Sequence, residues 1–167
     1  MDRKIIFLVI ILALAGCKQH NWIDWKTQNE MWLEANKSQP GVKTTDTGLQ
    51  YKIIADPTPQ DALPNSTSTV VCDYTLKLIN DYVIETANNA SLYLPQMIPG
   101  FAEGCHKIHN NGDIELYIPA YLGYDNSKYT SGAYDEAEGS GSEGGSYFIP
   151  PYSTLIFTIH ICGVSGN

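Results

Sequence analysis

The sequence predicts an α+β fold with an antiparallel β-sheet and one short internal helix, preceded by a short N-terminal helix. Segments rich in β-branched and aromatic residues follow one another in hairpin-like order. Only one internal segment, which begins at Pro99, has a helical pattern, whereas a parallel sheet would need strands and helices in alternation. At 167 residues the chain is long enough for one domain with extensions.

The first 16 residues have the pattern of a bacterial lipoprotein signal peptide. MDRK supplies two cations, and the apolar run from Ile5 to Ala15 has about half of the roughly 20 residues that a membrane-spanning helix needs. The run ends in LAGC, which resembles a lipobox. We therefore expect Cys17 to become the N-terminal residue and to carry diacylglycerol and palmitate as a lipid anchor. The alternative is an ordinary secretory signal followed by a chance cysteine.

Cleavage would leave a strongly acidic chain. Residues 1–16 contain Asp2, Arg3 and Lys4, so 8 of the 10 Lys and Arg and 17 of the 18 Asp and Glu remain, a net charge near −9. Nucleic-acid binding depends on cations that neutralise phosphates, so this composition argues against nucleic acid as a partner and against anionic headgroups as ligands.

Three further cysteines, Cys72, Cys105 and Cys162, form no C-x-x-C pair and have no histidine at metal-ligand spacing, so no metal site is expected. Buried free thiols are favoured for Cys72 and Cys105. A disulfide between these two stays open as an alternative, because the envelope is oxidising.

The segment 17–41 is expected to join the anchor to the domain. A thin stripe at near-helical spacing predicts one amphipathic helix between residues 18 and 37. The stripe consists of Trp22, Trp25, Asn29, Trp32 and Leu33. Three roles are open: a spacer, a clamp on the surface of its own domain, and a dimerising arm. Because the helix is too short to be stable alone, we favour docking or tethering.

The domain itself is expected to span residues 42–167. Pro40-Gly41 and Gly48 mark a linker before the first strand, LQYKII at 49–54. After the Pro-rich loop DPTPQDALPNSTS, a strand at 69–79 leads into Asn80-Asp81, a pair with hairpin-turn chemistry, and then into YVIET.

The second half of the domain continues with SLYLP, a short helix at 99–107, the turn HNNGD, and strands at 114–119 and 153–162. Gly, Ser and acidic residues dominate the stretch 126–147, and we expect a long mobile loop there because such a composition buries little apolar surface. Its acidic residues leave binding of calcium or a basic partner open, although their spacing does not fit an EF-hand. They are Asp135, Glu136, Glu138 and Glu143, together with Asp125 just before the stretch.

The order of these motifs resembles the FKBP-type peptidyl-prolyl cis-trans isomerases. The resemblance runs from Val42 to Val164 and is carried by TGLQYKII, VVCDYTLKL, QMIPGFAEG, IPAYLGY and FIPPYSTLIFTIHI. It implies a sheet curled around the short helix, an apolar cavity between them, and isomerisation of X-Pro bonds in envelope proteins without a cofactor. It further implies proline-containing polypeptide clients, macrolide inhibitors as ligands, and an outer-membrane location in a Gram-negative bacterium, facing the periplasm.

Site residues follow from the same resemblance. Tyr74, Glu85 and Tyr124 match catalytic positions, and the tyrosine that matches Tyr124 donates a hydrogen bond to the substrate carbonyl in relatives. The matching substrate-binding positions are Ile84, Leu92, Met97, Ile98, Phe101, Phe148, Ile149 and Phe157. Phe101 is expected to form the floor of the cavity.

The chain departs from the family pattern at four positions. Relatives usually have tryptophan where this chain has Phe101, an aromatic residue in place of Ile84, aspartate in place of Glu85, and glycine in place of Leu76. These departures predict a weakened isomerase. They also motivate an alternative function, an FKBP-like domain that binds extended peptide as a chaperone or assembly subunit with little or no turnover.

A hydrolase is not indicated. The four histidines, His20, His106, His109 and His160, accompany neither a G-x-S-x-G serine motif nor an H-E-x-x-H zinc motif. Taken singly, an aromatic residue in a strand is more often part of a core than of a binding site. The functional hypothesis therefore depends on the joint placement of the residues named above.

Overall fold

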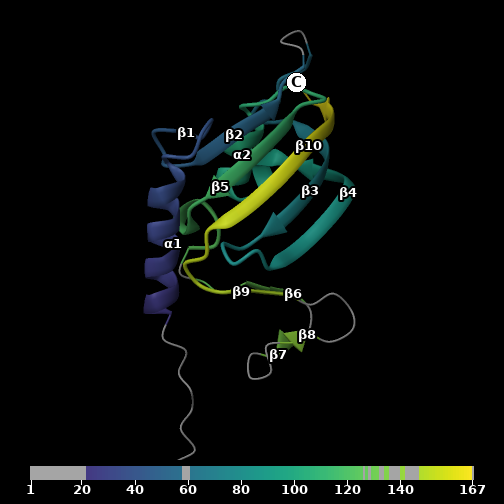
Figure 1. Cartoon of the computed structure of the whole chain (residues 1–167). Helices are drawn as coiled ribbons and strands as arrows, with labels where there is room; N and C mark the ends of the chain where they lie inside the picture. The colour runs from purple at the N-terminus through teal and green to yellow at the C-terminus, as the bar shows by residue number, and fades with distance from the viewer. Residues whose placement is uncertain are drawn as a thin grey trace, which may run out of the picture.

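Six antiparallel strands form the main sheet in the computed structural model, which describes residues 22–57, 61–125, 127, 129–131, 134–135, 140–141 and 147–166 (Figure 1). The strands are β1 (Lys43–Thr44), β2 (Gln50–Ala55), β3 (Thr69–Lys77), β4 (Val83–Tyr93), β5 (Asp113–Ile118) and β10 (Leu155–Ser165). Their order across the sheet is β1-β2-β5-β10-β3-β4, so the long strand β10 lies inside it. The predicted antiparallel sheet is confirmed. The predicted signal peptide, Cys17 and most of the stretch 126–147 lie outside the described residues.

The hairpin of β3 and β4 forms at the Asn80-Asp81 pair, as predicted. Asp81 has a φ of +63°, a left-handed conformation that aspartate tolerates better than most residues. Strand β4 is longer than either of the two short strands expected from the sequence. It contains a bulge, where Asn89 has a φ of +52° and its N–H donates to Asp73 Oδ1 at 2.7 Å. The polar stretch ANNA can therefore stay in the sheet without regular alternation.

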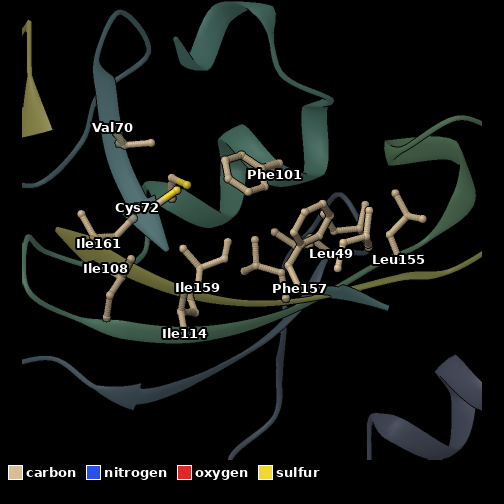
Figure 2. Close-up of a cluster of buried hydrophobic side chains, with 14 of the residues drawn as sticks. Leu49, Val70, Cys72, Phe101, Ile108, Ile114, Leu155, Phe157, Ile159 and Ile161 are labelled. Atoms are coloured by element: carbon tan, nitrogen blue, oxygen red, sulfur yellow. The ribbon is translucent and has the colours of Figure 1, made fainter. Parts of the chain in front are cut away.

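The short helix α2 (Pro99–Cys105) packs against β5. Its first residue is a proline, whose fixed φ and missing N–H suit the first position of a helix. The short 3₁₀ turns η1 (Leu94–Gln96) and η2 (Ala120–Leu122) flank α2 and β5 in the chain. Side chains with no exposed surface fill the space between α2 and the sheet (Figure 2). They include Leu49, Val70, Cys72, Phe101, Ile108, Ile114, Leu155 and Ile161.

The N-terminal helix α1 (Ile23–Asn36) lies along the side of the domain (Figure 1). The indole of Trp32 packs on the ring of Tyr117 with centroids 5.7 Å apart, and Asn36 Nδ2 donates to the buried Gln50 Oε1 at 2.9 Å. Of the three roles left open by the sequence, the described residues show the clamp. The expected stripe is incomplete. The buried residues of α1 are Asn29, which belongs to the stripe, and Asn36, which does not, and the amides of both are hydrogen-bonded to the domain.

No helix among the described residues is both long enough and apolar enough to cross a membrane.

Within and beside the stretch 126–147 the backbone forms two short pairs of strands. Strand β6 (Tyr129–Ser131) pairs with β9 (Tyr147–Ile149), and β7 (Tyr134–Asp135) pairs with β8 (Ser140–Gly141). Two short strand pairs therefore occur within and beside the stretch for which we expected a long mobile loop. The pairing of β6 with β9 joins residues of high β-propensity, such as Thr130 and Phe148.

The cysteines in the described part of the chain are free thiols, as favoured from the sequence. Cys72 and Cys105 have no exposed surface, and Cys162 is partly buried. Burial raises the pKa of Cys72 to about 12 and raises the pKa of Cys105 further. Both buried groups are therefore neutral thiols near pH 7 and act as apolar core residues.

Candidate functional site

Phe101 enters the core from the first turn of α2. Pro99 begins the helix, the preceding Ile98 has the extended conformation that proline imposes on its neighbour, and Phe101 N–H donates to Ile98 O at 3.0 Å. This geometry directs the Phe101 side chain from the helix toward β10 (Figure 2). A helix barely two turns long is enough for this purpose, because the sheet rather than the helix supplies most of the burial.

Phe101, Tyr74 and Phe157 form an aromatic cluster at the centre of the candidate site. The ring centroids of Phe101 and Phe157 lie 5.2 Å apart with planes inclined by 70°. Those of Tyr74 and Phe157 lie 5.8 Å apart, and those of Tyr74 and Phe101 lie 6.4 Å apart. Tilted and edge-to-face pairs at these distances each contribute about 0.5–1.5 kcal/mol beyond the area they bury. The three predicted site residues therefore pack together in one aromatic cluster.

Strand register explains why these rings meet. In β3 and β10, Tyr74 pairs with Ile159 and Leu76 pairs with Phe157. Side chains of directly opposed residues point to the same face of a sheet, and so do the side chains of residues two positions apart along one strand. Tyr74 and Phe157 are therefore diagonal neighbours on the face that α2 covers.

Four of the candidate residues, including Tyr74 of the cluster itself, are only partly buried. Tyr74, Met97, Ile98 and Tyr124 all pack against the core while keeping some exposed surface. The Phe101 and Phe157 rings are 0% and 6% exposed, so the expected floor residue is covered by its neighbours in this conformation. A ligand would first meet the four partly buried residues, which we call the rim.

Three candidate residues lie on β4. Ile84 is 8% exposed and belongs to the hydrophobic core. Glu85 pairs with Leu76, and Ala87, two positions further on, pairs with Tyr74, so the carboxylate and the Tyr74 phenol arise from adjacent strands. Leu92 pairs with Val70. Val70 precedes Tyr74 by four residues on β3, a distance of roughly 13 Å along the strand. The role of Leu92 as a wall of the pocket stays a prediction.

Two further candidates, Phe148 and Ile149, lie on β9 and are almost completely buried. Phe148 packs on the indole of Trp22 at the N-terminal end of the α1 segment, with ring centroids 5.8 Å apart. Reasoning from the sequence did not connect Trp22 with the site. The stripe in α1 indicated only that this face of the helix would be covered, without indicating by which part of the domain.

The chemistry available at this site is that of an apolar surface with phenols at its rim. Among the residues described, no group of three or more His, Cys, Asp and Glu side chains lies close enough together to hold a metal ion. Of the five acidic residues considered for calcium, Glu136, Glu138 and Glu143 lie outside the described residues. The described groups can desolvate a ligand, orient it and donate a hydrogen bond, which is what a reaction without covalent intermediates requires.

Comparisons with known proteins agree with this geometry. A family model described as "FKBP-type peptidyl-prolyl cis-trans isomerase" matches residues 60–162, and one described as "Domain amino terminal to FKBP-type peptidyl-prolyl isomerase" matches residues 17–53. "Outer membrane protein MIP" of Legionella longbeachae is 34% identical over 143 residues, which are 83% of this chain and 54% of the relative. The "FKBP-type 22 kDa peptidyl-prolyl cis-trans isomerase" of Escherichia coli is 30% identical over 78% of this chain and 56% of the relative.

Solved structures give the same result. The crystal structure of FkpA from Escherichia coli superposes with a TM-score of 0.70 at 28% identity, covering 85% of this chain and 60% of that one. A peptidyl-prolyl cis-trans isomerase from Pseudomonas syringae superposes with a TM-score of 0.69 and, at 19% identity, supports the fold alone. The chain spans between half and two thirds of the length of the curated relatives described above.

Proposed function

The chain belongs to the FKBP-type peptidyl-prolyl cis-trans isomerase family, and from this we propose that it catalyses cis-trans isomerisation of X-Pro bonds in proteins of the bacterial envelope. The observation that carries the proposal is the cluster of Tyr74, Phe101 and Phe157, together with the partly buried Tyr124, which packs against the same hydrophobic core. Proline-containing polypeptides are the proposed substrates, and macrolide inhibitors are proposed ligands of the same surface.

Such a surface can catalyse the reaction without a nucleophile or a cofactor. Rotation about the peptide bond breaks amide conjugation and has a barrier of about 20 kcal/mol. The planar ground state has more charge separation than the twisted transition state, so moving the bond from water to an apolar surface disfavours the ground state relative to the transition state. Each tenfold acceleration needs about 1.4 kcal/mol of this selective stabilisation.

Tyr124 has the proposed role of orienting the substrate by donating a hydrogen bond to its carbonyl oxygen. It follows η2 in a tight turn, where Asp125 N–H donates to Ala120 O at 2.7 Å and Asp125 has a φ of +53°. Tyr74 and Glu85 are proposed to act together at the opposite side of the rim. The glutamate side chain is one methylene longer than the aspartate of the family pattern, so we propose a lower activity than that of relatives.

Two-dimensional NMR exchange spectroscopy of a prolyl tetrapeptide tests this function. We expect catalytic amounts of the full chain, purified in detergent micelles, to raise the cis-trans exchange rate at least tenfold above the uncatalysed rate. A macrolide that binds the chain is expected to abolish the increase. An exchange rate equal to that of buffer with micelles would contradict the proposed activity.

A second candidate function is peptide binding with little or no turnover. Two departures from the family pattern favour it. Ile84 stands where relatives usually have an aromatic residue, and its side chain is buried in the core. Glu85 stands where relatives usually have aspartate. The same experiment separates the two functions: peptide resonances that shift on titration while the exchange rate stays at its uncatalysed value indicate binding alone.

We also propose that Cys17 carries the lipid anchor and that the chain is held at the outer membrane, facing the periplasm. The name of the Legionella relative, "Outer membrane protein MIP", supports an envelope location. The five residues from Cys17 to Trp22 reach at most about 18 Å, so the anchor would keep the contact of Trp22 with Phe148 near the bilayer surface.

Incorporation of radioactive palmitate is expected to disappear in Cys17→Ser, and undiminished incorporation would contradict the proposed anchor.

A further inference from the structure

Two turns carry residues of the candidate site. The first contains Tyr124 and Asp125 and follows η2, and the second, residues 150–154, connects Ile149 on β9 with β10. The N–H of Tyr152 in the second turn donates to the carbonyl oxygen of Asp125 in the first at 2.8 Å. The two turns are thus linked to each other, and a movement of one displaces the other.

Both turns contain a residue other than glycine with a left-handed backbone at the point where they are linked. Asp125 has a φ of +53° and Tyr152 a φ of +64°. Residues other than glycine adopt this left-handed region at a cost in free energy, and they keep it only where the surrounding structure holds them there. Contacts from outside the turns are therefore needed to stabilise this arrangement.

Helix α1 supplies such contacts. Asn29 Oδ1 accepts a hydrogen bond from the buried N–H of Thr154 at 2.7 Å. The indole N–H of Trp25 donates to Ser153 Oγ at 3.0 Å, and this hydroxyl donates in turn to Pro150 O at 2.8 Å, which closes the second turn.

Asn29 is itself held in position. Its side-chain nitrogen donates to Trp25 O at 2.8 Å, and the residue is only 2% exposed, so its oxygen has a fixed direction. A cavity of about 290 Å³ lies beside it and is lined also by Asp125, Tyr152 and Thr154. On this side the turns face a pocket rather than close-packed side chains, so the hydrogen bonds from α1 add to the contacts that packing supplies.

We propose that Asn29 is a positioning residue, which by accepting the hydrogen bond of Thr154 N–H holds both turns and thereby sets Tyr124 and Ile149 for the reaction. This inference rests on the proposed isomerase function. It gives the N-terminal helix a task in the site of the domain that it covers, beyond connecting that domain to an anchor.

Asn36 provides a matched control for Asn29. It is also a buried asparagine of α1, 7% exposed, and its side chain donates to Gln50 Oε1 on β2, away from both turns. Asn29→Ala and Asn36→Ala each remove one buried hydrogen bond between α1 and the domain, and we expect similar losses of thermal stability. Only Asn29→Ala is expected to alter the site.

We expect Asn29→Ala to raise KM for a prolyl tetrapeptide about tenfold and to change kcat by less than twofold, measured by NMR exchange on the full chain in micelles. Displaced turns lower the population of the binding-competent conformation, which substrate binding restores. Asn36→Ala is expected to leave both constants within twofold. The NMR resonances of the Tyr124 amide and the Ile149 methyl groups are expected to shift in Asn29→Ala and to stay in place in Asn36→Ala.

A native KM in Asn29→Ala, or an equal rise in Asn36→Ala, would overturn the proposal. If Asn29→Ala does not fold, Trp25→Phe serves instead, because it removes the indole donor to Ser153. We expect it to move the same two sets of resonances and to raise KM less. Resonances that stay at their native positions in Trp25→Phe would overturn the proposal. If the native chain shows no isomerisation, the proposed function fails separately, and the Tyr124 and Ile149 resonances still decide whether Asn29 positions the turns.

Discussion

Phe101→Ala is expected to destabilise the domain by about 3–5 kcal/mol, because a completely buried phenylalanine is replaced by a side chain that leaves a cavity. For a protein of this size the melting temperature should fall by roughly 6–20 °C. The substitution also removes the ring on which Tyr74 and Phe157 pack, so the remaining folded protein should lose most of the proposed isomerase activity.

Ile108→Ala is the matched control for this prediction. Ile108 is equally buried, and it lies toward Cys72 and Ile161, on the other side of Phe101 from Leu49 and Leu155 (Figure 2). The Ile108→Ala protein should lose about 2–5 kcal/mol of stability and keep its activity per folded molecule. Thermal denaturation and exchange kinetics measure the two effects. Equal loss of activity in both variants would contradict a specific role for the aromatic cluster.

Gly104→Ala is expected to destabilise the domain by overpacking, in contrast to the cavity left by Phe101→Ala. A Cβ atom at Gly104 would lie 2.3 Å from Leu116 Cδ1 and 2.4 Å from Cδ2, and Leu116 is itself completely buried on β5. Overpacking of this kind costs about 1–3 kcal/mol, whereas the better helix propensity of alanine returns at most about 1 kcal/mol. With the full gain from propensity the net loss in the free energy of unfolding by urea is up to about 2 kcal/mol, and we expect a value in the upper half of that range because two Leu116 carbons lie within 2.4 Å of the added Cβ.

Two variants separate this steric effect from a general intolerance of alanine. At Gly163 the nearest atom to an added Cβ is Val71 Cβ at 3.6 Å, an ordinary contact, so Gly163→Ala should change stability by less than about 0.5 kcal/mol. In the Gly104→Ala background, Leu116→Val makes room and should recover part of the loss. A Gly104→Ala protein as stable as the native chain would show that α2 and β5 are not in close contact.

The main sheet and α2 could be predicted from sequence because their signals are local. Proline at the first position of α2, the Asn80-Asp81 turn and the β-branched strands each specify their own structure. The length of β4 could not be predicted in this way. Its polar stretch reads as a loop, and it remains in the sheet through a bulge that depends on Asp73 of the neighbouring strand.

The aromatic cluster was predictable only through the family resemblance. Tyr74, Phe101 and Phe157 are far apart in the chain, and each alone has the pattern of a core residue. The contact surface of α1 was not predictable, because its decisive residues are polar. The amides of Asn29 and Asn36 can be buried because they are hydrogen-bonded to Thr154 and Gln50. A hydrophobic pattern contains no information about such partners.

The central claim is that a proline ring binds on the rim above the aromatic cluster while its peptide bond isomerises. Intermolecular nuclear Overhauser effects between a prolyl tetrapeptide and the full chain in micelles test it most directly. We predict contacts from the proline ring protons to the side chains of Tyr74, Ile98 and Tyr124. Accelerated exchange accompanied by proline contacts elsewhere on the domain, with none to these three residues, would contradict it.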